Sequence, residues 1–428
     1  MTTTLSPENR AGVRVLAELF AGAPLEQVGF RFWDGTPWPD GKPRRATIVL
    51  QHRGALRAMF SSASEKGLAE AYLADDFDIV GDVEAAFELT DFLGRRGASR
   101  GLAALVQYYH LRRLPAGPAR PRSNRAFSAT GGHRHSLERD RRAVTYHYDV
   151  SNDFFRLWLD HEMVYSCAYF ARADDDLDTA QAAKLDLLCR KLRLRPGQRL
   201  LDIGCGWGGL ALHAARRYGV TVTGVTLSRP QVELATARAA EAGLDHMVTF
   251  AARDYRELPE TDSYDAIVSV GMLEHVGAEQ LAGYFETAGR RLKPGGVFLN
   301  HAISEGARPR RRLGASFADA YVFPDGDIPP VPVVLRAAEA AGLEVRDVEN
   351  LREHYALTLR HWVRRLEAGH EAARAYVDEA IYRVWRLYMA GSAYGFAHGH
   401  LAVYQVLLSK SEQGGVAGLP LTRRDWYA

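Results

Sequence analysis

The sequence predicts an α/β fold with a doubly wound, mostly parallel sheet, preceded by a small α+β domain. Three observations support this prediction. From about residue 180 onward, apolar runs of strand length alternate with helical segments of about 10–15 residues, as in parallel sheets. A glycine-rich turn follows the first of these strands, which is typical of ligand-binding turns in doubly wound folds. A segment rich in Pro, Gly, Ser and Arg separates this part from the residues before it.

Composition and charge exclude several classes of protein. The chain has 428 residues, of which 47% are hydrophobic and 25% charged, and this length favours two or three domains. The formal net charge of +2 gives no overall field of the kind that attracts nucleic acid, so we expect no nucleic-acid partner. The cysteines are Cys167, Cys189 and Cys205, without a C-x-x-C pair, so we expect neither a disulfide framework nor a metal site, and a reducing compartment is favoured.

No membrane-spanning segment or leader is expected. The N-terminus lacks a basic stretch followed by an apolar core, so it does not resemble a signal peptide. No apolar run approaches the roughly 18 residues that cross a bilayer. Any contact with a membrane is therefore expected to be peripheral.

Residues 1–112 are predicted to form the small α+β domain. Residues 6–22 have the pattern of a helix, because Ser6 is a favourable N-cap and Pro7 fits the first helical position. The stretches "ATIVLQH" and "ALRAMF" are interpreted as strands or short buried segments. No catalytic constellation is evident in this domain.

Residues 113–142 are the best linker candidate, and residues 143–428 form the third predicted part. Arginines are concentrated between Arg112 and Arg142, and again at Arg308, Arg310, Arg311 and Arg312. These clusters either lie on solvated loops or contact an anionic surface such as phospholipid head groups.

The strands of the predicted sheet are expected, in order, in "QRLLDIGCG", "VTVTGVTL", "MVTFAARDY", "YDAIVSVG" and "GGVFLNHAIS". The helix in "GLALHAARRYG" ends at Gly219, and Ser228 can cap the helix after the second strand. Residues 355–410 are interpreted as helices. Their aromatic side chains belong either to a core or to a ligand pocket, and they are Trp362, Tyr376, Tyr382, Trp385, Tyr388, Tyr394, Phe396 and Tyr404.

The glycine-rich turn predicts a cofactor site. In "LLDIGCGWGGLAL", Asp202 precedes glycines at 204, 206 and 208, where a ligand can approach the backbone at a helix N-terminus. The spacing is DxGxGxG, whereas dinucleotide folds need GxGxxG. The second strand ends at Thr226, with Gln231 one turn further on, and no acid is present there. A tight turn without ligand is the alternative interpretation.

This turn on such a sheet resembles that of the class I S-adenosylmethionine-dependent methyltransferases. The resemblance places Asp254, after "VTFAAR", where an acid usually faces the adenine amine.

A second group of polar residues follows the neighbouring strands. Glu274 comes after the strand that ends at Gly271, and His301 lies near the carboxyl end of the next strand, on one face with Ile303. Ligands of open α/β sheets bind beyond these ends, so Glu274 and His301 are expected to converge. A core histidine satisfied by one hydrogen bond is the alternative for His301.

Several stretches in order resemble the cyclopropane-fatty-acyl-phospholipid synthase family, which includes the mycolic acid cyclopropane synthases. They are "YHYDVSNDFFRLWLDHEMVYSCAYF", "LDIGCGWGGLA", "GVTLSRPQ", "DYREL", "YDAIVSVGMLEHVG", "FLNHAI" and "EHYALTLRHW". The resemblance covers about residues 143–410 and implies a Rossmann-like methyltransferase sheet with a helical cover over the acyl site. The first domain more loosely resembles a sterol-carrier-like lipid-binding extension.

The resemblance implies transfer of a methylene equivalent from S-adenosylmethionine to a cis double bond of a phospholipid acyl chain. It implies cofactor contacts at Tyr165, Ser166, Asp202, Gly204, Gly206, Thr226, Leu227, Gln231, Asp254, Tyr255 and Val270. It implies a bicarbonate ion, taken to be the general base, held by Cys167, Glu274, His301, Ile303 and Tyr355.

Chemistry makes this arrangement sensible. Methyl transfer to an alkene leaves a carbocation, which a dry, aromatic-lined cavity protects. A proton must then leave the new methyl for the ring to close, so a base has to lie within hydrogen-bond reach. Peptide N–H groups near Cys167 and Ile303 are expected to hold the ion. Glu274 is expected to be protonated or to share a proton with His301.

Some residues depart from the family pattern on the acyl side, and they leave the product open. Leu273 stands where Phe is common, "HAI" replaces "HTI", "FPDGDIPP" replaces the usual turn, and "SAYGFAHGHLAVYQVLLSK" is interpreted as a diverged last helix. One alternative is a C-methyltransferase that gives a methylene- or methyl-branched acyl chain and has a reductase partner. Another is a catalytically inactive lipid-binding protein.

The expected partner is a bilayer surface with unsaturated phospholipids, and a homodimer is also considered. The expected location is the cytoplasm, at the inner face of the membrane. Binding to vesicles is expected to weaken with salt, because the arginine clusters would act through screened attraction.

Overall fold

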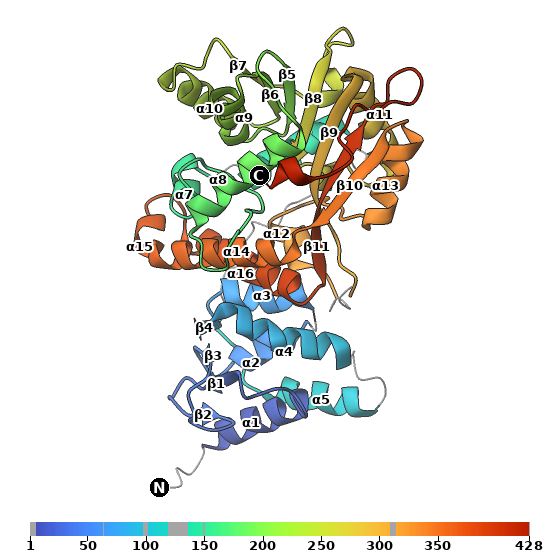
Figure 1. Ribbon diagram of the computed structural model, residues 1–428. Coiled ribbons are helices and arrows are strands. Elements are labelled where there is room, and N and C mark those ends of the chain that lie inside the picture. Colours follow the sequence, from blue (N-terminus) through green and yellow to red (C-terminus); the bar gives the residue numbers. More distant parts are fainter. Residues whose placement is uncertain are drawn as a thin grey trace. The chain divides into compact units, whose positions relative to one another are not determined.

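The computed structural model describes residues 6–62, 64–96, 102–118, 136–148, 150–308 and 314–427 (Figure 1). It divides into two compact units. The first takes its described residues from 1–128, 310–324 and 378–394, and the second from 129–309, 325–377 and 395–428. Most of the predicted linker 113–142 lies outside the described residues, as do Arg310, Arg311 and Arg312.

The first unit contains a four-stranded sheet of order β2-β1-β3-β4, with helices along it. The strands are β1 (Val28–Arg31), β2 (Pro37–Trp38), β3 (Ala46–Leu50) and β4 (Phe77–Gly81), and only β1 and β3 pair in parallel. The helices from the N-terminal part are α1 (Pro7–Leu19), α2 (Ala55–Phe60), α3 (Glu65–Leu73), α4 (Val83–Arg96) and α5 (Leu102–Arg113). The expected capping by Ser6 is present, since its hydroxyl accepts the Asn9 N–H at 3.1 Å.

One stretch of this unit was interpreted as a strand or a short buried segment. "ALRAMF" forms the short helix α2, which is partly buried, and so it is not a strand. Its buried residues Leu56 and Met59 are three positions apart, which places them on one face of a helix. A run of six residues is too short for periodicity to separate the two structures.

Two later segments complete the first unit. They carry α12 (Phe317–Tyr321) and most of α16 (Glu379–Ala397). Arg383 donates to the carbonyl of Tyr72 at 2.8 Å, and Arg386 donates to the Tyr72 hydroxyl at 2.8 Å. A Cβ on Gly391 would lie 2.7 Å from the ring of Phe87, so the helix approaches α4 closely. Nothing in the local sequence indicated this association.

The second unit is built on the predicted doubly wound sheet, which has seven strands in the order β10-β11-β9-β8-β5-β6-β7. The strands are β5 (Arg199–Ile203), β6 (Thr221–Thr226), β7 (Val248–Ala252), β8 (Tyr264–Val270), β9 (Leu292–Glu305), β10 (Glu344–Asn350) and β11 (Leu401–Ser409). The strands from β9 to β7 in this order pair in parallel, whereas β11 is antiparallel to both of its neighbours, β9 and β10. The α/β fold with a mostly parallel sheet is confirmed.

Strand β11 corrects the prediction that residues 355–410 are helical throughout. Helices α14 (Arg352–Ala368), α15 (His370–Ala373) and α16 end before residue 398, and the apolar run that follows is a strand. The stretch interpreted as a diverged last helix therefore contains the end of α16 and all of β11. Its residues are buried on both faces, so they show no alternation that would mark a strand.

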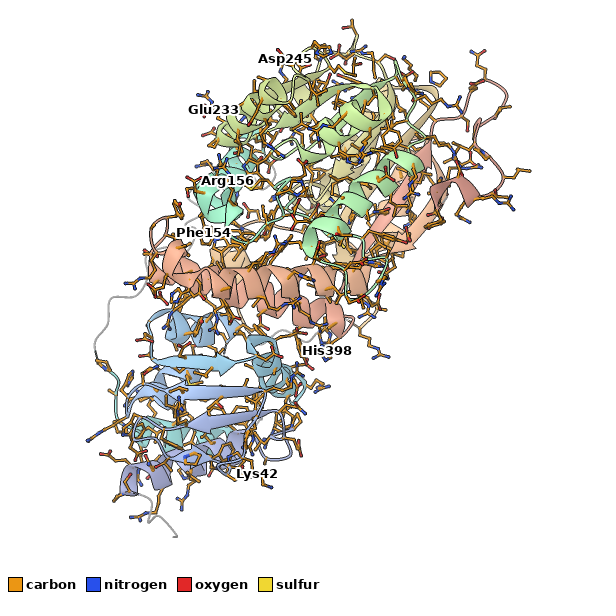
Figure 2. The ribbon with its side chains drawn as sticks, turned by 60° about the vertical axis from the view of Figure 1, so that its left-hand side comes forward. Lys42, Phe154, Arg156, Glu233, Asp245 and His398 are labelled. Carbon is orange, nitrogen blue, oxygen red and sulfur yellow. The ribbon has the colours of Figure 1, made fainter. Side chains whose placement is uncertain are left out.

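Helices cover both faces of this sheet (Figure 1). Leu200 packs in one core with α8 (Leu177–Lys191), α9 (Gly209–Tyr218) and α10 (Arg229–Glu241), while Leu201 packs in another with α11 (Leu281–Arg291) and α13 (Val331–Ala340). The unit also contains α6 (Leu137–Tyr148) and α7 (Asn152–Arg156). Phe154 on α7 is buried, whereas Arg156 on the same helix is exposed (Figure 2).

Among the described residues, no helix is both long and apolar enough to cross a bilayer.

Candidate active site

The glycine-rich turn lies between β5 and α9. Gly204, Gly206 and Gly208 all have a positive φ, of 83°, 54° and 82°, which side chains disfavour. A Cβ on Gly208 would lie 2.7 Å from the ring of Phe250, so this glycine is needed for packing. A Cβ on Gly206 would meet nothing within 4 Å, so this glycine leaves space beside the turn.

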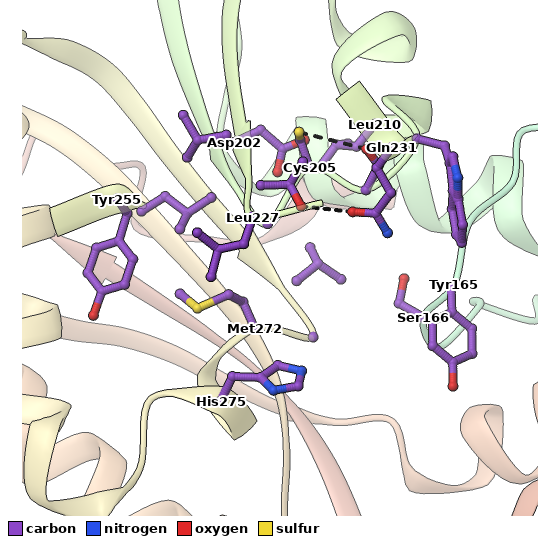
Figure 3. Close-up of a pocket in the computed structure, with 18 of the residues that line it drawn as sticks. Tyr165, Ser166, Asp202, Cys205, Leu210, Leu227, Gln231, Tyr255, Met272 and His275 are labelled. Carbon is purple, nitrogen blue, oxygen red and sulfur yellow. Dashed lines mark hydrogen bonds between the residues drawn. The ribbon is translucent and has the colours of Figure 1, made fainter. Parts of the chain in front are cut away.

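That space belongs to a pocket at the carboxyl ends of β5, β6 and β8 (Figure 3). It holds about 1140 Å³, part of it open to solvent. Figure 3 shows Tyr165 and Ser166 at one side and Tyr255 at the other. The structure brings all of the residues with an expected cofactor contact to its wall, namely Tyr165, Ser166, Asp202, Gly204, Gly206, Thr226, Leu227, Gln231, Asp254, Tyr255 and Val270.

Hydrogen bonds inside the wall orient two of its polar groups. The Thr226 hydroxyl donates to Oε1 of Gln231 at 2.8 Å. Ser228 caps α10, as predicted, by accepting the Gln231 N–H at 3.4 Å. Because Oε1 of Gln231 is used in this way, its amide group presents N–H donors to a ligand.

Asp254 has a partner that sequence reasoning did not anticipate. Arg256 donates to its carboxylate from Nε at 2.8 Å and from Nη2 at 2.7 Å. Arg256 also donates to Asp140 at 2.8 Å. The ion pair fixes the Asp254 carboxylate, which keeps lone pairs that can accept a ligand amine.

Lys184 is a wall residue that the sequence analysis missed. This lysine is fully buried on α8, and its Nζ donates to the Ser166 hydroxyl oxygen at 2.9 Å. Burial lowers the pKa of Lys184 to about 8, and burial raises the pKa of Asp202 to about 7. Oδ2 of Asp202 has no hydrogen-bond partner among the described residues. Lys184 follows the helix period of the buried apolar positions Leu177, Ala180 and Leu188, and that spacing is a signal that sequence reasoning could have used.

Hydrogen bonds join the two segments that carry Glu274 and His301, while convergence of the two side chains stays a prediction. Glu274 is in the short turn η2 (Leu273–His275), and its Oε1 accepts the Ile303 N–H at 2.7 Å. The Gly271 N–H donates to the His301 carbonyl at 2.8 Å. Oε2 of Glu274 and Nε2 of His301 are both buried and have no hydrogen-bond partner among the described residues.

Burial dominates the titration of both groups. It raises the pKa of Glu274 to about 7, and it lowers the pKa of His301 well below its ordinary value, with the charges of Lys184 and Lys191 adding to the effect. Burial therefore favours the protonated form of Glu274, and a proton shared with His301 stays a prediction. The Ile303 N–H, which was expected to hold an ion, instead bonds to Glu274.

Backbone groups of Leu351 connect Cys167 and Tyr355 to strand β11, which pairs with the strand that carries His301. The carbonyl of Leu351 accepts the Tyr355 N–H at 3.1 Å and lies 3.7 Å from the Cys167 sulfur. The Leu351 N–H donates to Val403, which pairs with Ile303 across β11 and β9. Burial raises the pKa of Cys167 far above its ordinary value, so this group is a thiol and not a nucleophilic thiolate.

Aromatic rings link the two parts of the site. Trp362 lies between Tyr165 on the pocket wall, with ring centroids 5.1 Å apart, and Tyr355, at 6.1 Å. Tyr355 also contacts Phe396 at 4.6 Å. Of the aromatic side chains predicted as core or pocket, Trp362 and Phe396 lie next to the site, whereas those at 382, 385 and 388 belong to the first unit.

Comparisons with known proteins agree with this geometry. The chain is 40% identical over 400 residues to a probable fatty acid methyltransferase of Pseudomonas putida, covering 93% of this chain and 95% of that protein. It is 41% identical over 271 residues to the cyclopropane-fatty-acyl-phospholipid synthase of Escherichia coli, covering 63% of this chain and 68% of that protein.

Among solved structures, the mycolic acid cyclopropane synthase CmaA1, complexed with SAH and CTAB, matches 63% of this chain and 97% of its own, with 38% identity and a TM-score of 0.59. The profile of the mycolic acid cyclopropane synthetase family matches residues 135–406. The chain therefore belongs to the mycolic acid cyclopropane synthetase family.

Proposed function

We propose that this protein is a cyclopropane-fatty-acyl-phospholipid synthase, within the S-adenosylmethionine-dependent methyltransferases of its family. The observation that carries the proposal is a cofactor-sized pocket whose wall includes Met272 and His275, the residues that flank the buried Glu274 in the sequence. His301 is buried on β9, next to the strand that leads to Glu274. The pocket takes S-adenosylmethionine, which supplies an electrophilic methyl group. The acyl double bond would meet that methyl on the side of the aromatic rings.

The wall of the pocket fits this cofactor. Asp202 offers an unpartnered, buried carboxylate oxygen to an ammonium group, and Ser166 offers a hydroxyl to a carboxylate. Gln231 and Asp254 present a donor and an acceptor to the nucleoside. Such a set recognises a molecule with an amino acid at one end and an adenosine at the other.

The second region handles charge and protons. Trp362 and Tyr355 offer ring faces that stabilise a cation on the acyl chain and exclude water. Glu274 and His301 hold the buried polar atoms that would retain a bicarbonate ion and manage the proton that leaves the methyl. Because the Ile303 N–H is occupied by Glu274, the expected residues left to hold this ion are Cys167, Glu274, His301 and Tyr355.

The product distinguishes this function from the alternative, a C-methyltransferase that gives a methylene- or methyl-branched acyl chain. Purified protein is incubated with vesicles of unsaturated phospholipid and methyl-labelled S-adenosylmethionine, and the fatty acids are examined by proton NMR. High-field ring protons are expected. Vinylic methylene signals would instead establish C-methylation, and a lack of label in lipid would favour the inactive carrier.

Lys184→Met is expected to weaken binding of S-adenosylhomocysteine about 10-fold or more, because Ser166 loses the ammonium that orients and polarises its hydroxyl. Binding of 5′-methylthioadenosine, which lacks the amino acid, is expected to change little. Calorimetric titration of both ligands measures the difference. Equal losses for the two ligands would mean that Lys184 only supports the fold, and Lys184→Arg, which keeps the charge, is the matched control.

We also propose peripheral contact with a bilayer, through attraction between lipid phosphates and the arginine-rich sequence around Arg308. Sedimentation with anionic vesicles is expected to weaken as salt is raised, whereas binding that does not depend on salt would exclude this attraction.

A further inference from the structure

A buried chain of polar side chains lies behind His301. Gln405 stands directly opposite His301 in the β9–β11 pair, and its Nε2 is 3.3 Å from Nδ1 of the imidazole. Oε1 of Gln405 accepts from Nζ of Lys191 at 2.8 Å, and Lys191 is paired in turn with the Glu349 carboxylate. His301, Gln405 and Lys191 are 2%, 1% and 0% exposed. Of these four hydrogen-bonded side chains, only that of Glu349 is partly exposed to water.

The chemistry of lysine fixes the direction of every hydrogen bond in this chain. An ammonium group has only donors, so the atom of Gln405 that faces Lys191 must be its oxygen. The amide N–H of Gln405 then faces His301, and Nδ1 must accept it. A neutral imidazole carries one proton, which is therefore on Nε2.

His301 is neutral, because it is buried and close to two ammonium groups, Lys184 and Lys191. Its Nε2–H has no acceptor among the described residues. A buried donor without a partner costs free energy, so its retention points to an oxygen of a bound ion or ligand.

We propose that Lys191 and Gln405 are positioning residues that hold His301 in the Nε2–H tautomer, so that it donates a hydrogen bond to an anionic oxygen in the active site. This inference rests on the proposed function and refines the role of one site residue. His301 holds the base or its ion and does not itself accept the proton that leaves the methyl. Sequence reasoning placed His301 in the site, but it named neither of the two residues behind it.

A purely structural network is the competing explanation, since buried ion pairs often persist without a catalytic role. The substitution Gln405→Glu separates the two explanations. A carboxylate has the same shape but only acceptors, so it takes a hydrogen bond from Lys191 and another from His301. Nδ1 then carries the proton, and Nε2 becomes an acceptor.

The tautomer is read from ¹⁵N NMR of histidine-labelled protein, with the His301 signals assigned by their loss in a His301→Gln variant. Wild-type protein is expected to show a protonated Nε2, and Gln405→Glu a protonated Nδ1. Turnover of Gln405→Glu is expected to fall about 100-fold or more, with the affinity for S-adenosylhomocysteine unchanged.

Glu349, the partner of Lys191, provides a control for the change in charge. The double variant Glu349→Gln/Gln405→Glu restores the net charge but keeps the reversed hydrogen bond, so its turnover is expected to stay low. Recovery in the double variant, or wild-type turnover in Gln405→Glu, would overturn the positioning role. If Gln405→Glu does not fold, Lys191→Met, which frees the amide of Gln405 to rotate, is expected to give a mixture of tautomers.

A protonated Nδ1 in the wild-type protein would overturn the inference without any variant. The spectrum requires no turnover, so it also distinguishes a failure of this inference from a failure of the proposed function. A protein that makes no cyclopropane can still show the expected tautomer.

Discussion

Glu274→Gln is expected to lower turnover by a factor of about 10² to 10⁴, the range in which positioned acid–base groups act. Glutamine keeps the size of the side chain and can still accept the Ile303 N–H, which is 2.7 Å from Oε1 in the wild-type protein. It cannot gain or lose a proton. Transfer of label from S-adenosylmethionine into phospholipid vesicles measures the loss.

Cofactor affinity is expected to stay within a few-fold of the wild type in this variant, because Glu274 does not line the cofactor pocket. Calorimetry with S-adenosylhomocysteine checks this, and Glu233→Gln, on the exposed face of α10, serves as the control for handling and charge. Wild-type turnover in the glutamine variant would remove Glu274 from the mechanism. A fall in affinity as large as the fall in turnover would make it a binding residue.

The same substitution is expected to stabilise the protein at neutral pH. The pKa of Glu274 is raised from 4.5 to about 7 by burial, so the folded state holds its proton over a pH range in which the unfolded chain has released it. Raising the pH through this window therefore costs the wild-type protein stability, by about 3 kcal/mol at most. Glutamine is neutral throughout and avoids this loss.

Thermal unfolding in the absence of ligand, followed by tryptophan fluorescence at several pH values, tests this expectation. Near pH 4.5 the melting temperatures of the wild-type protein and Glu274→Gln are expected to lie close together. By pH 8 the variant is expected to melt several degrees higher. A constant gap across this range would mean that the Glu274 carboxyl is not perturbed, and Glu233→Gln is expected to track the wild type. If Glu274→Gln loses activity and gains stability, the buried acid lowers the stability of the wild-type protein and is retained for its function.

Much of the fold could be predicted from the sequence, because its signals are local. The glycines at 204, 206 and 208 require a positive φ, and that requirement is written into the residue type. Strands β5 to β9 are marked by apolar runs between helical segments. Strand β11 was misassigned because a strand buried on both faces has no alternation, and its place between β9 and β10 depends on partners about 100 and 60 residues away.

The sequence by itself determined the glycine-rich turn, the succession of strands β5 to β9 along the chain, and the acid and imidazole near the ends of β8 and β9. Only the tertiary structure decided which groups stand behind them. Lys184, Lys191 and Gln405 look like ordinary polar residues of a helix or strand, and burial gives each of them a fixed partner. The physical reason is that groups that meet in space set the direction of a hydrogen bond. Gln405 lies more than 100 residues away in the sequence from each of its two partners, Lys191 and His301, so no local pattern can reveal these bonds.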